Sequence, residues 1–178
     1  VDMQYFGERS TDLLTTFTEE DKHEHLYNRP GVYLSWIVQN TKDISRSFDF
    51  LVREKGVDPA RVGLFGISRG AQLAMIAGAV ERRLAAVLLL HGGHFDRFET
   101  EHLPAACPAN YIGRISPRPL LMVNGTQDTD YDKAASIDPL YELAKEPKQI
   151  IWVVDGGHMA MEEEHRSAMV KWLRQNVK

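Results

Sequence analysis

Short apolar runs alternate with longer amphipathic segments along most of the chain. The run at 84–90 is apolar throughout, as expected for a parallel strand that is covered on both faces. In the segment 34–55, by contrast, apolar side chains such as Ile37, Ile44 and Phe48 recur at helical spacing. The pattern predicts strands at 61–66, 84–90, 120–123 and 149–154, and helices at 34–55, 68–80, 131–145 and 159–177. This alternation indicates an α/β protein with a mainly parallel sheet and helices on both of its faces.

The composition fits one folded domain that spans residues 1–178. Hydrophobic residues make up 43% of the chain and charged residues 26%, which disfavours a disordered or fibrous protein. A formal net charge of −4, with basic residues scattered among acidic ones, argues against nucleic acid as a partner. The longest apolar run, 73–80, is far shorter than the roughly 20 residues of a membrane span, so no membrane segment is predicted. The only cysteine, Cys107, cannot form an internal disulfide and no signal peptide is visible, which slightly favours a cytoplasmic location.

The first predicted strand leads into a G-x-S-x-G pattern, in which Ser68 lies between Gly66 and Gly70. A serine on a sharp turn between a strand and a helix exposes its hydroxyl group, and such a turn needs neighbours without Cβ atoms. The helix start also places N–H groups and a partial positive charge where an oxyanion would develop. A helix-capping serine after a glycine-rich turn is the structural alternative. The flanking strand and helix favour a nucleophile.

A serine nucleophile needs a base, and the base is oriented by a carboxylate. Asp128 follows the strand predicted at 120–123, and His158 follows the strand predicted at 149–154. The carboxyl ends of parallel strands meet at one edge of a sheet, so Ser68, Asp128 and His158 are expected to lie together. Their order along the chain, serine then acid then histidine, is the order of one large hydrolase architecture.

Three motifs together resemble the α/β-hydrolase superfamily: Gly-Ile-Ser-Arg-Gly at 66–70, Asn-Gly-Thr-Gln-Asp at 124–128 and Gly-Gly-His at 156–158. Within the superfamily, the chain resembles the dienelactone hydrolase-like and acetyl xylan esterase-like branches. The resemblance covers nearly the whole chain and implies a three-layer α/β-hydrolase fold. Dienelactone hydrolase itself has a cysteine where Ser68 stands, so the difference favours a serine esterase.

The resemblance implies a role for each matching residue. Ser68 is the expected nucleophile, His158 the general base and Asp128 the carboxylate that orients the base. The backbone N–H of Arg69 is the expected oxyanion donor, and no residue is assigned as the second donor. This chemistry requires no cofactor and no metal.

The resemblance also implies that the chain is the C-terminal portion of the fold. Residues 2–10 resemble the loop that follows the family's fourth strand, so the earlier strands are expected to precede Val1. Either an upstream segment of the same polypeptide or another chain is expected to complete the sheet.

Other candidate residues have simpler interpretations. His91 and His94 belong to a His-Gly-Gly-His segment that resembles the oxyanion loop of lipases, but this segment follows the nucleophile and is interpreted as a structural strand end. Asp96 is the reserve candidate for the carboxylate that orients the base. Asp130 and Asp132 are interpreted as solvated residues at a helix start.

The remaining features are interpreted as structural. His23 and His25 lack the spacing of a metal site, and 162–164 is interpreted as the solvated first turn of the last helix. The segment 95–115 has no clear period and is predicted to be a loop or small cap. Among the aromatic residues, core or interface anchors are expected at Trp36, Trp152 and Trp172, and pocket-lining residues at Tyr5 and Phe6.

The sequence therefore predicts a serine carboxylic ester hydrolase that acts on a small-molecule ester through an acyl-enzyme. A peptidase or an acyltransferase on the same scaffold remains open, because the three residues choose neither the leaving group nor the acceptor. A non-catalytic hydrolase-like binding module remains open as well.

Overall fold

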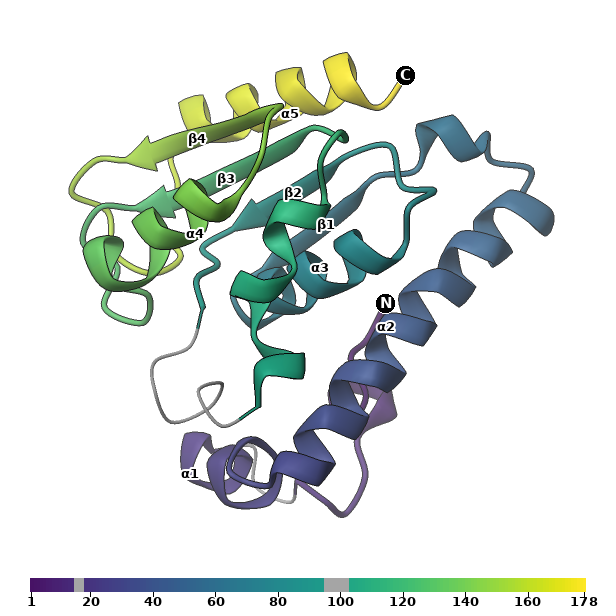
Figure 1. The fold of residues 1–178 in the computed structure, drawn as a ribbon, viewed down its shortest axis with the longest axis vertical. Helices are drawn as coiled ribbons and strands as arrows, with labels where there is room; N and C mark the ends of the chain where they lie inside the picture. Colours follow the sequence, from purple (N-terminus) through teal and green to yellow (C-terminus); the bar gives the residue numbers. More distant parts are fainter. Residues whose placement is uncertain (15–17, 95–102) are drawn as a thin grey trace.

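A computed structural model describes residues 1–14, 18–94 and 103–178. Within these residues, four parallel strands form one sheet in the order β1-β2-β3-β4, with helices on both faces (Figure 1). The predicted α/β class is therefore confirmed. The strands are β1 (Leu64–Ile67), β2 (Val87–Leu90), β3 (Leu120–Gly125) and β4 (Lys148–Val153).

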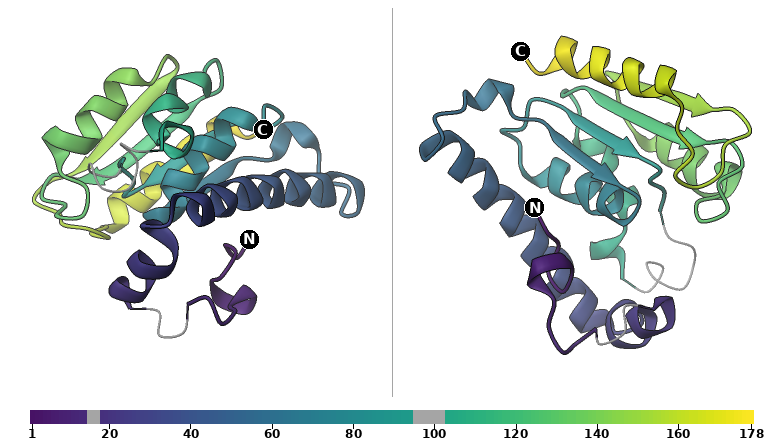
Figure 2. Two further views of the ribbon diagram at one scale, coloured as in Figure 1. Left: turned by 60° about the horizontal axis from the view of Figure 1, so that its bottom comes forward. Right: turned by 180° about the vertical axis from the view of Figure 1, so that it is seen from behind.

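Helices cover the two faces of the sheet unequally (Figure 2). On one face lie α3 (Arg69–Val80) and α4 (Asp138–Leu143), and on the other lies α5 (Glu163–Asn176). Successive residues of β2 alternate between the two cores: Leu89 packs with the α3 and α4 residues, and Leu88 packs with Trp172 of α5. This double coverage explains why β2 is apolar at every position.

The longest helix, α2 (Pro30–Arg53), packs alongside α3 next to the β1 edge. Its buried residue Trp36 also holds the N-terminal segment, because the indole Nε1–H donates to the carbonyl of Gln4 at 2.8 Å. The N–H of Gln4 in turn donates to Oδ1 of Asn40 at 2.8 Å. The N-terminal residues are thereby fastened to α2.

The last helix starts later than the predicted 159–177, at Glu163. The side chain of Glu162 accepts a hydrogen bond from the backbone N–H of His165, and the His165 side chain accepts from the N–H of Glu162. This reciprocal cap ends the preceding loop at a defined residue. The acidic first turn of the helix was predicted correctly.

The helix predicted at 131–145 is two short elements. A π-helical turn, η7 (Lys133–Ile137), begins where the side chain of Asp132 accepts a hydrogen bond from Ala135 N–H at 2.7 Å, and α4 follows it. The interpretation of Asp132 as a helix-start residue is correct. Asp130 is solvated, as predicted, but it precedes this helix start and is not part of it.

Other boundaries also shift. Both β1 and β2 begin three residues later than predicted, and α2 begins four residues earlier than predicted. The described part of the segment 95–115 contains short 3₁₀ turns at η4 (Pro104–Ala106), η5 (Pro108–Asn110) and η6 (Ile112–Arg114). Asp96, the reserve candidate for the carboxylate that orients the base, lies outside the described residues. Three short described elements that the sequence analysis did not predict precede α2: η1 (Gly7–Arg9), α1 (Glu19–Lys22) and η2 (His23–Tyr27).

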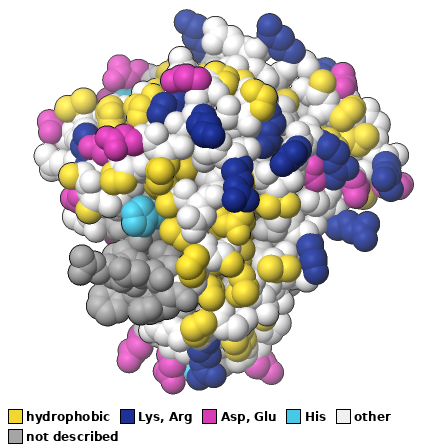
Figure 3. All heavy atoms as spheres, viewed as in Figure 1, with side chains coloured by type: hydrophobic (Ala, Val, Ile, Leu, Met, Phe, Trp, Pro, Cys, Tyr) yellow, Lys and Arg dark blue, Asp and Glu magenta, His cyan; other side chains and the backbone are white. Residues whose placement is uncertain are grey.

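The surface mixes apolar and charged side chains. Figure 3 shows hydrophobic side chains gathered down the middle of the face that Figure 1 presents, with charged side chains of both signs around them. In the described part of the chain, no helix combines the length and the apolar character that crossing a lipid bilayer requires. Of the three tryptophans, Trp36 and Trp172 are buried in the core, and Trp152 is half-buried.

Candidate active site

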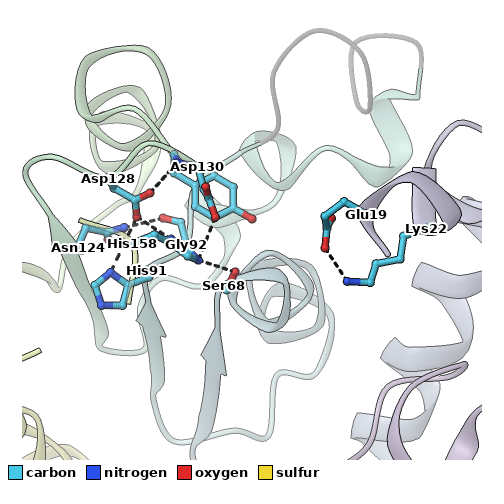
Figure 4. A network of polar contacts seen from close by, with 10 residues as sticks. Glu19, Lys22, Ser68, His91, Gly92, Asn124, Asp128, Asp130 and His158 are labelled. Carbon is cyan, nitrogen blue, oxygen red and sulfur yellow. Dashed lines mark hydrogen bonds and ion pairs between the residues drawn. The ribbon is translucent and has the colours of Figure 1, made fainter. Parts of the chain in front are cut away.

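The three residues predicted from the strand ends meet at the carboxyl edge of the sheet (Figure 4). Ser68 directly follows β1, whereas Asp128 and His158 lie in the loops after β3 and β4. The Oγ atom of Ser68 is 2.9 Å from Nε2 of His158. The Nδ1 atom of the same ring is 2.9 Å from Oδ2 of Asp128. The structure therefore brings the three side chains into one hydrogen-bonded chain.

Ser68 lies on a strained turn between β1 and α3. Its φ of 51° and ψ of −117° are a conformation that L-residues rarely adopt, and its N–H donates to the carbonyl of Leu90 at 2.8 Å. A Cβ atom on Gly66 would lie 2.8 Å from Cα of Ala71 and closer still to the carbonyl of Gly70. Gly66 is therefore required for the turn. Gly70 is not required, because a Cβ there would meet no described atom within 4 Å.

This difference between the two glycines is a testable prediction. Gly66→Ala is expected to lower the free energy of unfolding by about 3 kcal/mol and Tm by about 6–12 °C, because the added methyl group presses on backbone that cannot rotate away. The matched variant Gly70→Ala is expected to stay within about 1 kcal/mol of the parent, since alanine is a better helix former than glycine. Thermal unfolding followed by circular dichroism measures both. Equal effects of the two substitutions would contradict this account of the turn.

Asp128 is held in place by the backbone that follows it. Its Oδ1 atom accepts the N–H groups of Asp130 at 2.9 Å and Tyr131 at 3.0 Å, and its side chain is fully buried. An ionised carboxylate only accepts hydrogen bonds, so His158 carries its proton on Nδ1. The Nε2 atom then presents a lone pair to the hydroxyl group of Ser68. The geometry thus sets the tautomer that a general base needs.

Two further rings surround the imidazole of His158. The rings of His91 and Tyr131 each meet it edge-on, with centroids 5.7 Å away. His91 is fully buried, and its Nδ1 lies 3.9 Å from Oδ2 of Asp128. Burial and the neighbouring charge of His158 lower the pKa of His91, and Asp128 and the Ala160 backbone act in the opposite direction. The neutral form of His91 is therefore favoured.

The sequence analysis placed His91 correctly at a strand end but missed its contact with His158. Its position was the available signal, because it directly follows β2, which lies between the strand that precedes Ser68 and the strand that precedes Asp128. Neither ring nitrogen of His91 has a hydrogen-bond partner of standard geometry among the described residues.

Asp130 is the second residue that the sequence analysis interpreted too simply. Its carboxylate is solvated, with 60% of the side chain exposed, but Oδ2 lies 3.5 Å from Nε2 of His158. Nε2 is the nitrogen that also faces Ser68. The two aspartates therefore lie on opposite sides of the imidazole: Asp128 on the Nδ1 side and Asp130 on the Nε2 side (Figure 4).

Side chains of the kinds that bind metal ions lie close together around His158. Ligand atoms of His91, Asp128 and His158 lie within 4.8 Å of one another and could hold a metal ion. A metal there would compete for the atoms that connect Asp128 to His158. In the described residues, the other such group is Glu162, Glu164 and His165 on the first turn of α5, and neither group includes His23 or His25.

The side chain of Arg69, the residue after Ser68, contacts Tyr27 and Gln72. Its guanidinium lies over the ring of Tyr27, 3.9 Å from the centroid, and its Nη1 donates to Oε1 of Gln72 at 3.1 Å. The aromatic residues expected to line a pocket, Tyr5 and Phe6, pack against the core of α2, where the Phe6 and Trp36 ring centroids are 6.3 Å apart.

The fold is that of the α/β hydrolases. A cold-adapted esterase from an Arctic intertidal metagenomic library, in its PEG-bound structure, superposes with a TM-score of 0.70 at 20% identity, over 99% of this chain and 68% of that one. The α/β hydrolase GrgF from Penicillium sp. sh18 superposes with a TM-score of 0.64 at 14% identity, over 79% of this chain and 72% of that one. These likenesses confirm the predicted fold, and the dienelactone hydrolase-like branch stays a prediction.

In sequence, the chain is similar to the protein YfhR of Escherichia coli. It is 29% identical over 147 residues to YfhR of strain O157:H7, and the match covers 74% of this chain and 51% of that protein. It is also 29% identical over 135 residues to YfhR of strain K12, 69% of this chain and 47% of that protein. The chain thus spans about half the length of these relatives. No protein-family model matches it.

Proposed function

We propose that the protein is a serine hydrolase that cleaves small-molecule carboxylic esters through an acyl-enzyme. The observation that carries the proposal is the hydrogen-bonded chain from Ser68 through His158 to Asp128, with both contacts at 2.9 Å. A serine hydroxyl group on a strained turn, beside a base held in the right tautomer, is the arrangement that nucleophilic catalysis needs. The names of the superposed proteins, an esterase and an α/β hydrolase, support this reading.

The proposed reaction has two halves. Ser68 Oγ attacks the ester carbonyl carbon while Nε2 of His158 takes the hydroxyl proton, and the carbonyl π electrons move to oxygen. Nε2 then gives the proton to the leaving alcohol as the C–O bond breaks, which leaves an acyl-serine. In the second half His158 activates water in the same way, and the acid and free Ser68 are released. Asp128 stabilises the imidazolium in both halves.

The negative oxygen of the tetrahedral intermediate needs a donor. We assign this role to the backbone N–H of Arg69, which begins α3 directly after the nucleophile. The N-terminal end of a helix carries a partial positive charge, so it favours an oxyanion at this position. No second donor is assigned.

An activity-based probe tests the proposal and its alternatives. A fluorophosphonate is expected to label the protein once, with the added mass mapped to Ser68, because only an activated serine reacts. Turnover of p-nitrophenyl acetate is then expected, and p-nitroanilides of amino acids report whether the protein is a peptidase instead. An unlabelled, folded protein would contradict the proposal and favour a binding module.

We also propose that a further strand pairs with β1 in the fully active form. The N–H groups of Leu64 and Ser68 donate to backbone carbonyl groups on the β2 side of the strand. The N–H groups of Phe65 and Ile67 alternate with them and therefore point away from β2. No described strand pairs with that edge, and the side chains of Phe65 and Ile67 are 48% and 39% exposed. An apolar groove of about 330 Å³ follows the edge, between β1, α2 and α3. Such an edge promotes pairing with another strand.

The strand is expected to come from an upstream segment of the same polypeptide or from another chain. An oxyanion hole with one donor in place of two is expected to lower kcat by about 10²–10³. A fully active sample is therefore expected to contain more than these 178 residues in one fold. Intact-mass analysis with size-exclusion light scattering decides this. A monomer of 20.2 kDa that turns over esters at roughly 10 s⁻¹ or faster would overturn it.

A further inference from the structure

A carboxylate faces the reactive nitrogen of His158 from the solvent side. Oδ2 of Asp130 lies 3.5 Å from Nε2, although its side chain is 60% exposed. The backbone of Asp130 is fixed nearby, because its N–H donates to Oδ1 of Asp128 at 2.9 Å. Figure 4 shows the Asp130 carboxylate directed at the imidazole. A side chain with that much access to water has no packing reason to take this direction.

Among the described residues, no lysine or arginine lies close enough to Asp130 to neutralise its charge. The partner of Asp130 within ion-pair distance is His158. Two basic residues that flank the site residues in sequence have other partners: Arg69, next to Ser68, lies over Tyr27 and bonds to Gln72, and Lys133 pairs with Asp138 at 2.7 Å. Within the described part of the chain, the Nε2 side of the imidazole therefore carries a negative charge that no lysine or arginine balances.

This position is where the leaving group must be. In the proposed reaction Nε2 of His158 protonates the leaving oxygen, which has to come within about 3 Å of that nitrogen. Asp130 Oδ2 is already 3.5 Å from the same atom. The alcohol part of the ester is thus placed against a carboxylate, while the acyl part remains on Ser68. A charge on the alcohol would feel this carboxylate at contact distance.

We propose that Asp130 forms a subsite for a cationic leaving group, so that esters of amino alcohols or quaternary ammonium alcohols are preferred. The inference rests on the proposed ester hydrolysis. A neutral alcohol is accepted as well, and an anionic alcohol is repelled. Since opposite unit charges in contact attract measurably even in water, the preference for a cationic alcohol over an uncharged one of the same shape is expected to be about fivefold to tenfold.

A pair of isosteric esters measures this preference. Acetylcholine and 3,3-dimethylbutyl acetate have the same shape and differ by one positive charge, so their ratio of kcat/KM reports the charge alone. The ratio is expected to be about 5–10 at low salt and to fall towards 1 at about 0.5 M salt, where screening is strong. In Asp130→Asn the ratio is expected to be near 1 at both salt concentrations.

Asp132→Asn is the matched control, because it removes the same charge two residues away. Asp132 is exposed and caps η7 through Ala135, a role that asparagine keeps, so its ratio is expected to match the parent's. An unchanged ratio in Asp130→Asn, or a parent ratio of 1 or less, overturns the subsite. Hydrolysis of the neutral ester separates the two proposals. If it occurs without charge preference, only the subsite fails; if it is absent and Ser68 is not labelled, ester hydrolysis fails and the subsite with it.

Discussion

Replacing Ser68 with alanine is expected to abolish the hydrolysis of short-chain aryl esters, with kcat falling by about 10⁶, the scale of losing the nucleophile in a serine hydrolase. The structure gives the reason: Oγ of Ser68 lies 2.9 Å from Nε2 of His158, and alanine removes this oxygen. Without the oxygen no acyl-enzyme forms. Steady-state kinetics with p-nitrophenyl acetate measure the loss.

The control for this prediction is Ser167→Ala, which removes the same atom from an exposed position of α5. It is expected to keep the parent activity. Ser68→Ala is expected to fold, because the side chain of Ser68 makes no helix-capping bond that alanine would lose. Circular dichroism checks this. A folded Ser68→Ala protein within tenfold of the parent would remove Ser68 from the mechanism.

The location of the site was predictable because it depends on few structural facts. Ser68, Asp128 and His158 each follow an apolar run of strand length, and in a parallel sheet all such ends lie at one edge whatever the order of the strands. Errors of a few residues in the strand boundaries, as at β2, therefore left the grouping intact. The fold class followed from the same pattern.

The orientation of individual side chains was not predictable in this way. Asp128, Asp130 and Asp132 fall within five residues, and sequence alone does not say which carboxylate faces the imidazole. The turn decides it: Oδ1 of Asp128 binds the N–H groups of Asp130 and Tyr131 and thereby bends the chain back over His158. Similarly, the burial of His91 depends on how the loops pack above the sheet. Tertiary contacts, which have no local pattern, determine both.

Asp128→Asn is expected to lower kcat by about 10⁴, because Asp128 is the proposed carboxylate that orients the base His158. Asparagine keeps the shape of the side chain but can turn an NH₂ donor towards His158. The imidazole then takes the tautomer with its proton on Nε2, and Nε2 cannot accept the proton of Ser68. The buried Oδ2 of Asp128 lies 2.9 Å from Nδ1, a direct contact that leaves no room for a bridging water.

Two matched variants give this prediction its contrast. Asp96→Asn and Asp130→Asn remove the same charge, from the reserve candidate and from the carboxylate on the Nε2 side, and both are expected to change kcat for a neutral ester much less than Asp128→Asn does. For Asp128 and Asp130 the expected order follows from the ring nitrogen that each carboxylate faces, since only a partner of Nδ1 sets the tautomer. Steady-state kinetics on p-nitrophenyl acetate rank the three variants. A larger loss in Asp96→Asn than in Asp128→Asn would assign the orienting carboxylate to Asp96, and the contact between Asp128 and His158 would then be structural.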